Sequence, residues 1–270
     1  MRIWHQSFAT LSRLPAYDSA LREHIRKVAR PDTEVVMHGM HKGTYRHDYP
    51  GTDLRHGYVQ MLHSQQFAYA AILAEEQGFD AYAITTLPEP SLREIRSLVS
   101  IPVVGYGESA MLTACQLGHK FGVLLFIAEM IPQIETNVRL IGLEGRCAGV
   151  RHVGFHFNDV LANFASPQPV VDKFIAAARR LIAEGADVII PGEAPLNVLL
   201  ARAGVNRVDD VPILDGIATI MKSAEMMADL RTRLGISRCT RGYYQEMPPR
   251  DRIKELAAFY GIASLFQQDH

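Results

Sequence analysis

The sequence contains one pattern twice, and this duplication limits the folds open to the chain. The first copy begins at Phe67 and the second at Phe174, and in each a helix-like, alanine-rich stretch ends at a Gly-x-Asp triplet. An apolar run follows in both copies, at 81–84 and 188–190. The two copies are too far apart for a solenoid repeat, and their spacing suits two related domains. A chain of duplicated halves places a cleft between them, with matching loops facing each other across it.

Strand-like runs alternate with helical patterns, which is typical of parallel sheets covered by helices on both faces. Most of these runs are apolar throughout, as strands buried on both faces should be. The expected strands are 2–6, 34–38, 81–84, 102–105, 121–126, 149–153, 188–190 and 211–214. We predict an α/β fold of two flavodoxin-like, three-layer parallel-sheet domains related by a pseudo-twofold axis. The first domain comprises 1–117 plus 216–270, and the second 118–215.

Composition narrows the class of partner. The 270 residues are 48% hydrophobic and 21% charged, with a net charge of −1, and no basic stripe points to a nucleic-acid partner. No apolar run is long enough to cross a bilayer, and the first residues lack a signal-peptide pattern, so we expect no membrane partner and a cytoplasmic location. The three cysteines are widely spaced, which predicts neither a disulfide framework nor a zinc site.

The candidate site lies where strands end. In open α/β sheets, ligands bind beyond the carboxyl ends of the strands, where loops lead into helix N-termini. The residues at these ends are small or polar and form the predicted substrate-binding set: Gln6, Ser7, Thr85, Gly107, Glu108, Ser109, Gly192 and Asp215. Structural roles stay open for several of them. Asp215 also suits an N-cap, and Glu108 also suits the first turn of a helix, where an acid favours the helix dipole.

A long segment after the second predicted strand breaks the regular pattern. Residues 38–55 are rich in Gly, His, Tyr and Asp and carry no apolar period. Such a loop is typical of a lid or a substrate-binding loop. Its histidines are not spaced in a register that would fix a metal geometry, so we predict no metal there.

Two motifs within the two-half layout carry a resemblance to a known family. They are the stretch at 102–110, Pro-Val-Val-Gly-x-Gly-Glu-Ser-Ala, and the Ile-Leu-Asp-Gly element at 213–216. With this order and spacing, residues 1–235 resemble the aspartate/glutamate/hydantoin racemase superfamily, and most of all its hydantoin and allantoin racemase branch. The resemblance implies a cofactor-independent enzyme, a small carboxylate, hydantoin or cyclic amide as substrate, and a homo-oligomer.

The resemblance also implies a catalytic pair, and here the chain departs from the family. Family members carry one cysteine at the start of a Cys-Phe-Gly-Asp-Pro-Gly-Leu-like loop and another in a Leu-Gly-Cys-Ala-Gly-like loop. The thiols flank the acidic carbon of the substrate, where one removes a proton and the other returns one. Thr86 and Glu193 stand at these two positions. Both catalytic cysteines are therefore missing, and Thr86 and Glu193 become the predicted catalytic residues.

This replacement changes the expected chemistry. A threonine hydroxyl cannot act as a base unaided, whereas a glutamate can do so when burial raises its pKa. One base and one hydroxyl favour a one-sided reaction, namely hydrolysis, isomerisation or decarboxylation, over two-base racemisation. Two alternatives stay open. The chain could be a true racemase or epimerase with atypical bases, or a small-molecule-binding protein that has lost the chemistry.

Overall fold

The computed structural model describes residues 1–262 and confirms the α/β class with parallel sheets. The first sheet has the order β2-β1-β3-β4 and the second the order β6-β5-β7, and all pairs within them are parallel. The first sheet consists of β1 (Arg2–Gln6), β2 (Glu34–His38), β3 (Ala81–Ile84) and β4 (Val103–Gly105). The second consists of β5 (Phe121–Leu125), β6 (Cys147–His152) and β7 (Val188–Pro191). The loops that follow the carboxyl ends of the strands of the two sheets can meet between the two halves of the chain.

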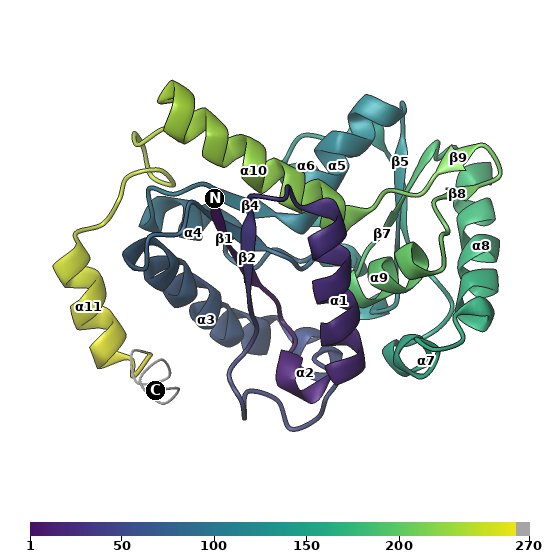
Figure 1. Cartoon of the computed structure of the whole chain (residues 1–270), viewed down its shortest axis with the longest axis horizontal. Helices are drawn as coiled ribbons and strands as arrows, with labels where there is room; N and C mark the ends of the chain where they lie inside the picture. Colours follow the sequence, from purple (N-terminus) through teal and green to yellow (C-terminus); the bar gives the residue numbers. More distant parts are fainter. Residues whose placement is uncertain (263–270) are drawn as a thin grey trace.

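Helices pack around both sheets (Figure 1). Those around the first sheet are α1 (Pro15–Val28), α3 (Gly57–Glu76), α4 (Leu92–Leu98), α5 (Tyr106–Leu117) and α10 (Gly216–Leu234). Those around the second are α6 (Ile131–Leu140), α8 (Gln168–Ala183) and α9 (Ala194–Arg202). The repeated phenylalanines, Phe67 of α3 and Phe174 of α8, are both fully buried. The duplicated pattern therefore places the same residue in each core.

The predicted strand at 211–214 was expected to belong to a parallel sheet, and its observed pairing is different. The chain forms a two-residue antiparallel pair there, β8 (Arg207–Val208) with β9 (Val211–Pro212), and Ile213 makes a single parallel bridge to Ile189. Pro212 has no N–H for a ladder, and the chain turns at Asp215 into α10. Two short helices, α2 (Gly51–Leu54) and α7 (Phe157–Ala162), were not predicted, because four to six residues carry no measurable apolar period.

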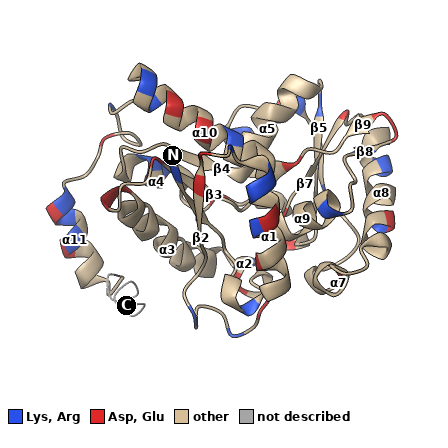
Figure 2. Cartoon of the chain, viewed as in Figure 1, with Lys and Arg blue, Asp and Glu red and all other residues tan. Residues whose placement is uncertain are grey.

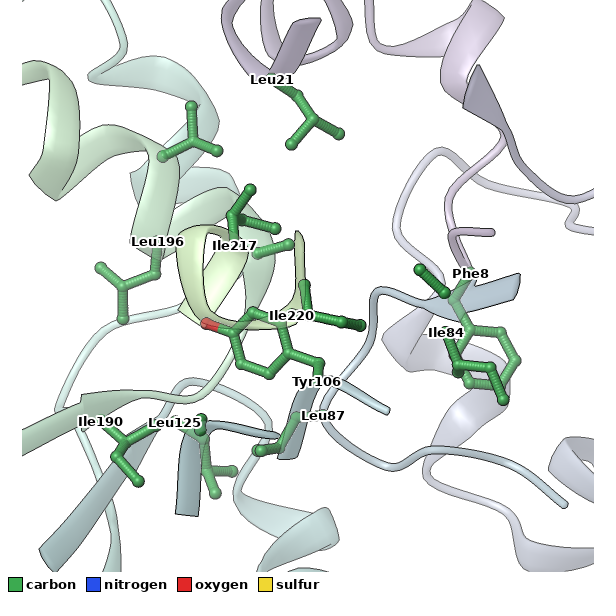
Figure 3. Close-up of a cluster of buried hydrophobic side chains, with 14 of the residues drawn as sticks. Phe8, Leu21, Ile84, Leu87, Tyr106, Leu125, Ile190, Leu196, Ile217 and Ile220 are labelled. Atoms are coloured by element: carbon green, nitrogen blue, oxygen red, sulfur yellow. The ribbon is translucent and has the colours of Figure 1, made fainter. Parts of the chain in front are cut away.

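The two halves share a buried apolar contact that fixes how their loops face each other (Figure 3). Leu87 and Tyr106 of the first half lie in one cluster with Leu125, Ile190 and Leu196 of the second. Ile217 and Ile220 of α10 complete it, and none of these side chains is more than 5% exposed. Because a close-packed contact of this kind resists sliding, the cleft between the halves has a defined shape.

The C-terminal segment lies at the edge of this body, where Arg250 pairs with Glu75 of α3. In Figure 1 the helix α11 (Arg250–Phe259) lies beyond a long connection from α10, and its one buried side chain is Ala257. The end of the predicted first domain, 263–270, lies outside the described residues. Basic and acidic residues are interspersed over the surface helices (Figure 2). No helix within residues 1–262 combines the length and apolar character needed to span a membrane.

Candidate active site

A small cavity of about 60 Å³ lies between the two halves, at the carboxyl ends of strands from both sheets. Four of the predicted site residues line it: Ser7, Thr85, Thr86 and Glu193. The remaining walls are mostly apolar, and they include Phe8, Tyr17, Tyr49, Leu54, Phe126, Ile127 and Phe157. The matching loops of the duplicated halves therefore converge on one pocket. A few polar groups within apolar walls are typical of a small-molecule site.

Glu193 is the carboxylate of this cavity. It precedes α9, but its side chain does not cap that helix. Instead Oε1 accepts hydrogen bonds from the backbone N–H groups of Phe126 (2.9 Å) and Ile127 (3.2 Å). The residue as a whole keeps some exposure, yet Oε2 is buried and has no hydrogen-bond partner among the described residues. Burial raises the pKa of Glu193 to about 8, against the two backbone hydrogen bonds that lower it. Such a group can donate or accept a proton near neutral pH.

Thr86 lies on a loop that hydrogen bonds hold in place on the side of α5. Its carbonyl accepts from the Glu89 N–H (3.2 Å), and the Glu89 carboxylate accepts from the Glu108 N–H at the start of α5 (2.8 Å). Glu89 and Ser91 both have a left-handed backbone, with φ of 47° and 55°. Burial raises the pKa of Glu89 to about 8 as well. The loop therefore presents Thr86 to the cavity while Glu89 ties it to α5.

The other two hydroxyls at the cavity are held by neighbours on the first sheet. Thr85 donates to the carbonyl of Gln6 (2.8 Å), and its oxygen lies 2.7 Å from Nε2 of His5. Burial lowers the pKa of His5 to about 3, so this imidazole is neutral and serves as a fixed hydrogen-bonding group. The Ser7 oxygen accepts from the Ala9 N–H (3.0 Å). These contacts orient the hydroxyls and supply no strong base to Thr86.

Six predicted substrate-binding residues do not line this cavity, namely Gln6, Gly107, Glu108, Ser109, Gly192 and Asp215. Four of the six have structural partners elsewhere. Glu108 forms an ion pair with Arg96 of α4, with Nη1 and Oε1 3.1 Å apart. Asp215 caps α10 by accepting from Ala218 and also pairs with His24 at 2.7 Å. The Gln6 carboxamide accepts from Trp4, and the Gly192 N–H donates to the carbonyl of Leu124 at 2.7 Å.

Tyr49 is a cavity residue that sequence reasoning did not single out. It lies in the predicted lid segment, next to α2, and its ring stacks on Phe157 of the second half, with centroids 4.8 Å apart. Burial and the neighbouring Glu193 carboxylate raise the pKa of its hydroxyl. A side chain at Gly51 would meet the Tyr49 ring at 2.2 Å, so glycine leaves room for it. An Arg55–Glu129 ion pair of 2.7 Å also joins this segment to the second half. The segment therefore covers the cavity.

No cysteine lines the cavity. Cys115 and Cys147 are half-buried elsewhere, and Cys239 is exposed. Within residues 1–262, no three His, Cys, Asp or Glu side chains gather as metal ligands would. Among the residues that the structure describes, the cavity is lined by one carboxyl group, that of Glu193, and by the two tyrosines Tyr17 and Tyr49.

Comparisons with known proteins place this chain in a family. A model of the Asp/Glu/hydantoin racemase family matches residues 15–224, and the chain belongs to that family. It is 30% identical over 154 residues to a hydantoin racemase of Rhizobium meliloti, a match covering 57% of this chain and 62% of that protein. It is 26% identical over 216 residues to a hydantoin racemase of Pseudomonas sp. (strain NS671), covering 77% and 80% of the two chains.

Solved structures show the same fold. An allantoin racemase from Klebsiella pneumoniae is similar, with a TM-score of 0.76 at 20% identity, covering 93% of this chain and 94% of that one. An allantoin racemase from Pseudomonas fluorescens is similar, with a TM-score of 0.73 at 26% identity, covering 93% and 98%. The two-domain, parallel-sheet architecture predicted from the duplication is thereby supported.

Proposed function

We propose that this chain is a cofactor-independent enzyme that transfers a proton at an acidic carbon of a small carboxylate, hydantoin or related cyclic amide. Glu193 is the acid–base group, and Thr86 binds the oxygen on which negative charge develops. The reaction is an isomerisation or a decarboxylation, in which the proton is transferred on one face of the carbon. The observation that carries this proposal is the Glu193 carboxyl, which lines the cavity with one oxygen held by two amides and the other without a hydrogen-bond partner among residues 1–262.

The cavity suits Glu193 to this task in two ways. Its apolar walls keep the carboxyl protonated up to a pH of about 8, so that it can deliver a proton to a carbanion-like intermediate at neutral pH. The two hydrogen bonds to Oε1 leave Oε2 as the atom that meets the substrate. A general acid or base is most efficient when its pKa lies near the working pH.

The hydroxyls fit a binding role better than a nucleophilic one. A threonine nucleophile needs an adjacent base. The histidine in this region, His5, contacts Thr85 instead of Thr86, and it is a weak base. Thr86 and Ser7 can donate hydrogen bonds to a carboxylate or an enolate oxygen, whereas the Thr85 hydroxyl already donates to the Gln6 carbonyl. Donors of this kind, aimed at developing charge, are a large part of catalysis in many enzymes.

The test is a substrate panel in deuterated water. Hydantoins, allantoin, arylmalonates and cyclic imides are incubated with the protein, and NMR and mass spectrometry follow deuterium uptake, loss of CO₂ and addition of water. We expect deuterium at the former acidic carbon, with turnover falling at least about 1,000-fold in Glu193→Gln. Addition of water without deuterium at carbon would contradict proton transfer and indicate hydrolysis.

Racemisation is the second candidate, because the named relatives are hydantoin and allantoin racemases. It predicts deuterium uptake together with loss of optical rotation in an enantiopure substrate, whereas one-sided transfer preserves one configuration. A thermal shift on binding with no turnover would instead favour a small-molecule-binding protein. A cytoplasmic location and assembly into a homo-oligomer stay predictions.

A further inference from the structure

A buried tyrosine of the first half reaches across to the loop that carries Glu193. Tyr106 is the first residue of α5, and it is fully buried. Its hydroxyl donates to the carbonyl of Pro191, at 2.7 Å, and Pro191 precedes Glu193 by two residues at the end of β7. In Figure 3 the Tyr106 hydroxyl points toward the side where Ile190 and Leu196 lie. This bond links the two halves at the base of the candidate site.

The peptide group between Pro191 and Gly192 is held on both of its sides. On one side the Gly192 N–H donates to the carbonyl of Leu124 (2.7 Å), and on the other the Pro191 carbonyl accepts from Tyr106. Directly beyond this peptide group, Glu193 precedes α9, and its own carbonyl accepts from the Asn197 N–H (3.0 Å). Tyr106 therefore gives this loop of the second half a hydrogen bond from the first half.

The surroundings of Tyr106 show that its position is closely determined. The Asn197 side-chain oxygen lies 3.3 Å from the Tyr106 hydroxyl, and it also accepts from the Ile217 N–H at 2.8 Å. At Gly216, a side chain would meet the Tyr106 ring and hydroxyl at 2.2 and 2.3 Å, so the start of α10 leaves room for the ring. The hydroxyl thus joins the N-terminal ends of α9 and α10 to the loop.

We infer that Tyr106 is a positioning residue for Glu193, holding its loop so that the carboxyl meets the amides of Phe126 and Ile127 and presents Oε2 to the substrate. This inference rests on the proposed function of Glu193. The physical reason is geometric, because a shift of about 1 Å in a reacting group can cost roughly 100-fold in rate. Without the hydroxyl, the Pro191 carbonyl is left buried and unpaired, which favours a displaced loop.

The chain offers a matched control for this bond. Tyr82 of β3 is also fully buried, and its hydroxyl donates to a carbonyl, that of Phe67, at 2.9 Å. Tyr82 does not line the cavity. Tyr106→Phe and Tyr82→Phe therefore each remove one buried hydroxyl–carbonyl bond, and they should lower the melting temperature by similar amounts. Only the first should disturb the site.

Two measurements are made on the wild type and both variants. The first is kcat and KM on a substrate found in the panel. The second is amide hydrogen exchange at Phe126 and Ile127, whose N–H groups bind the Glu193 carboxylate. In Tyr106→Phe we expect kcat to fall roughly 10- to 100-fold with little change in KM, and exchange at both amides to accelerate. In Tyr82→Phe we expect neither effect.

The outcomes separate this inference from the proposed function. Unchanged exchange at both amides in Tyr106→Phe overturns the positioning role, whatever the activity. Faster exchange with an unchanged kcat overturns its importance for the reaction. Faster exchange in a protein whose wild type turns over no substrate supports the positioning role and refutes the proposed function.

Discussion

Replacing Glu193 with glutamine should change how the stability of the protein depends on pH. Burial raises the pKa of Glu193 in the folded protein to about 8, while in the unfolded chain it returns to about 4.5. Between these two values the unfolded carboxyl has lost its proton and the folded one has kept it. The folded state then binds more protons, so the free energy of unfolding falls as the pH rises from 4.5 to 8. Glutamine cannot ionise, and it removes this dependence.

The size of the effect follows from the two pKa values. Each pH unit in the window changes the free energy of unfolding by up to about 1.4 kcal/mol, so the limit between pH 5 and pH 8 is about 4 kcal/mol. Water that enters the cavity in solution reduces this, and we expect about 2 to 4 kcal/mol. Relative to the wild type, Glu193→Gln should gain that amount between pH 5 and pH 8.

The assay is urea unfolding of both proteins at a series of pH values from 5 to 8. Other buried groups also titrate abnormally. The pKa of Glu89 is raised to about 8, while those of His5 and His38 are lowered to about 3 and about 4. These groups are present in both proteins, so their contributions cancel in the difference between the two profiles. Parallel profiles, with a constant difference across the series, would refute the conclusion that the cavity keeps Glu193 protonated.

Three further predictions concern the loops around the cavity. Ser91→Gly should raise the free energy of unfolding by about 0.5 to 1 kcal/mol in urea melts, because Ser91 has a left-handed backbone and its side chain caps no helix; a loss of stability would contradict this. Thr86→Val should lower kcat roughly 100-fold, and Thr86→Ser should largely restore it; equal activity of both variants would exclude an oxygen-binding role. Tyr49→Ala should move the alkaline limb of the pH–rate profile to lower pH, toward the ordinary pKa range of a carboxyl, by admitting water to Glu193. Tyr49→Phe, which keeps the ring stacked on Phe157, should not, and identical profiles for the two would argue against a covering role.

The parts of the site that follow from sequence are those set by strand direction. The duplicated apolar runs leave little choice but buried parallel strands, and the carboxyl ends of such strands gather at one edge. Thr86 and Glu193 occupy matching loops of the two copies, and the structure brings both to one cavity. Ser7 and Thr85 meet them because β1 and β3 are neighbours in the first sheet.

The sequence could not separate site residues from residues with structural roles where their partners lie elsewhere in the chain. Asp215 and Glu108 stand at strand ends just as Glu193 does, but Asp215 pairs with His24 of α1 and Glu108 with Arg96 of α4. Nothing local to either residue predicts such a partner. Tyr49 could not be predicted for a similar reason. It lies in a segment without apolar period, and its contact is a ring of the other half.

A raised pKa does not by itself identify the acting carboxylate in this protein. Glu89 and Glu193 stand on the matching loops, both are held by backbone N–H groups, and burial raises the pKa of each to about 8. They differ in what their carboxyls face, because Glu89 points back to the start of α5 while Glu193 lines the cavity shared by the two halves. Glu89→Gln should therefore act chiefly on stability and loop order, whereas Glu193→Gln should abolish turnover. Equal losses of turnover at matched stability would mean that the cavity is not where the proton is transferred.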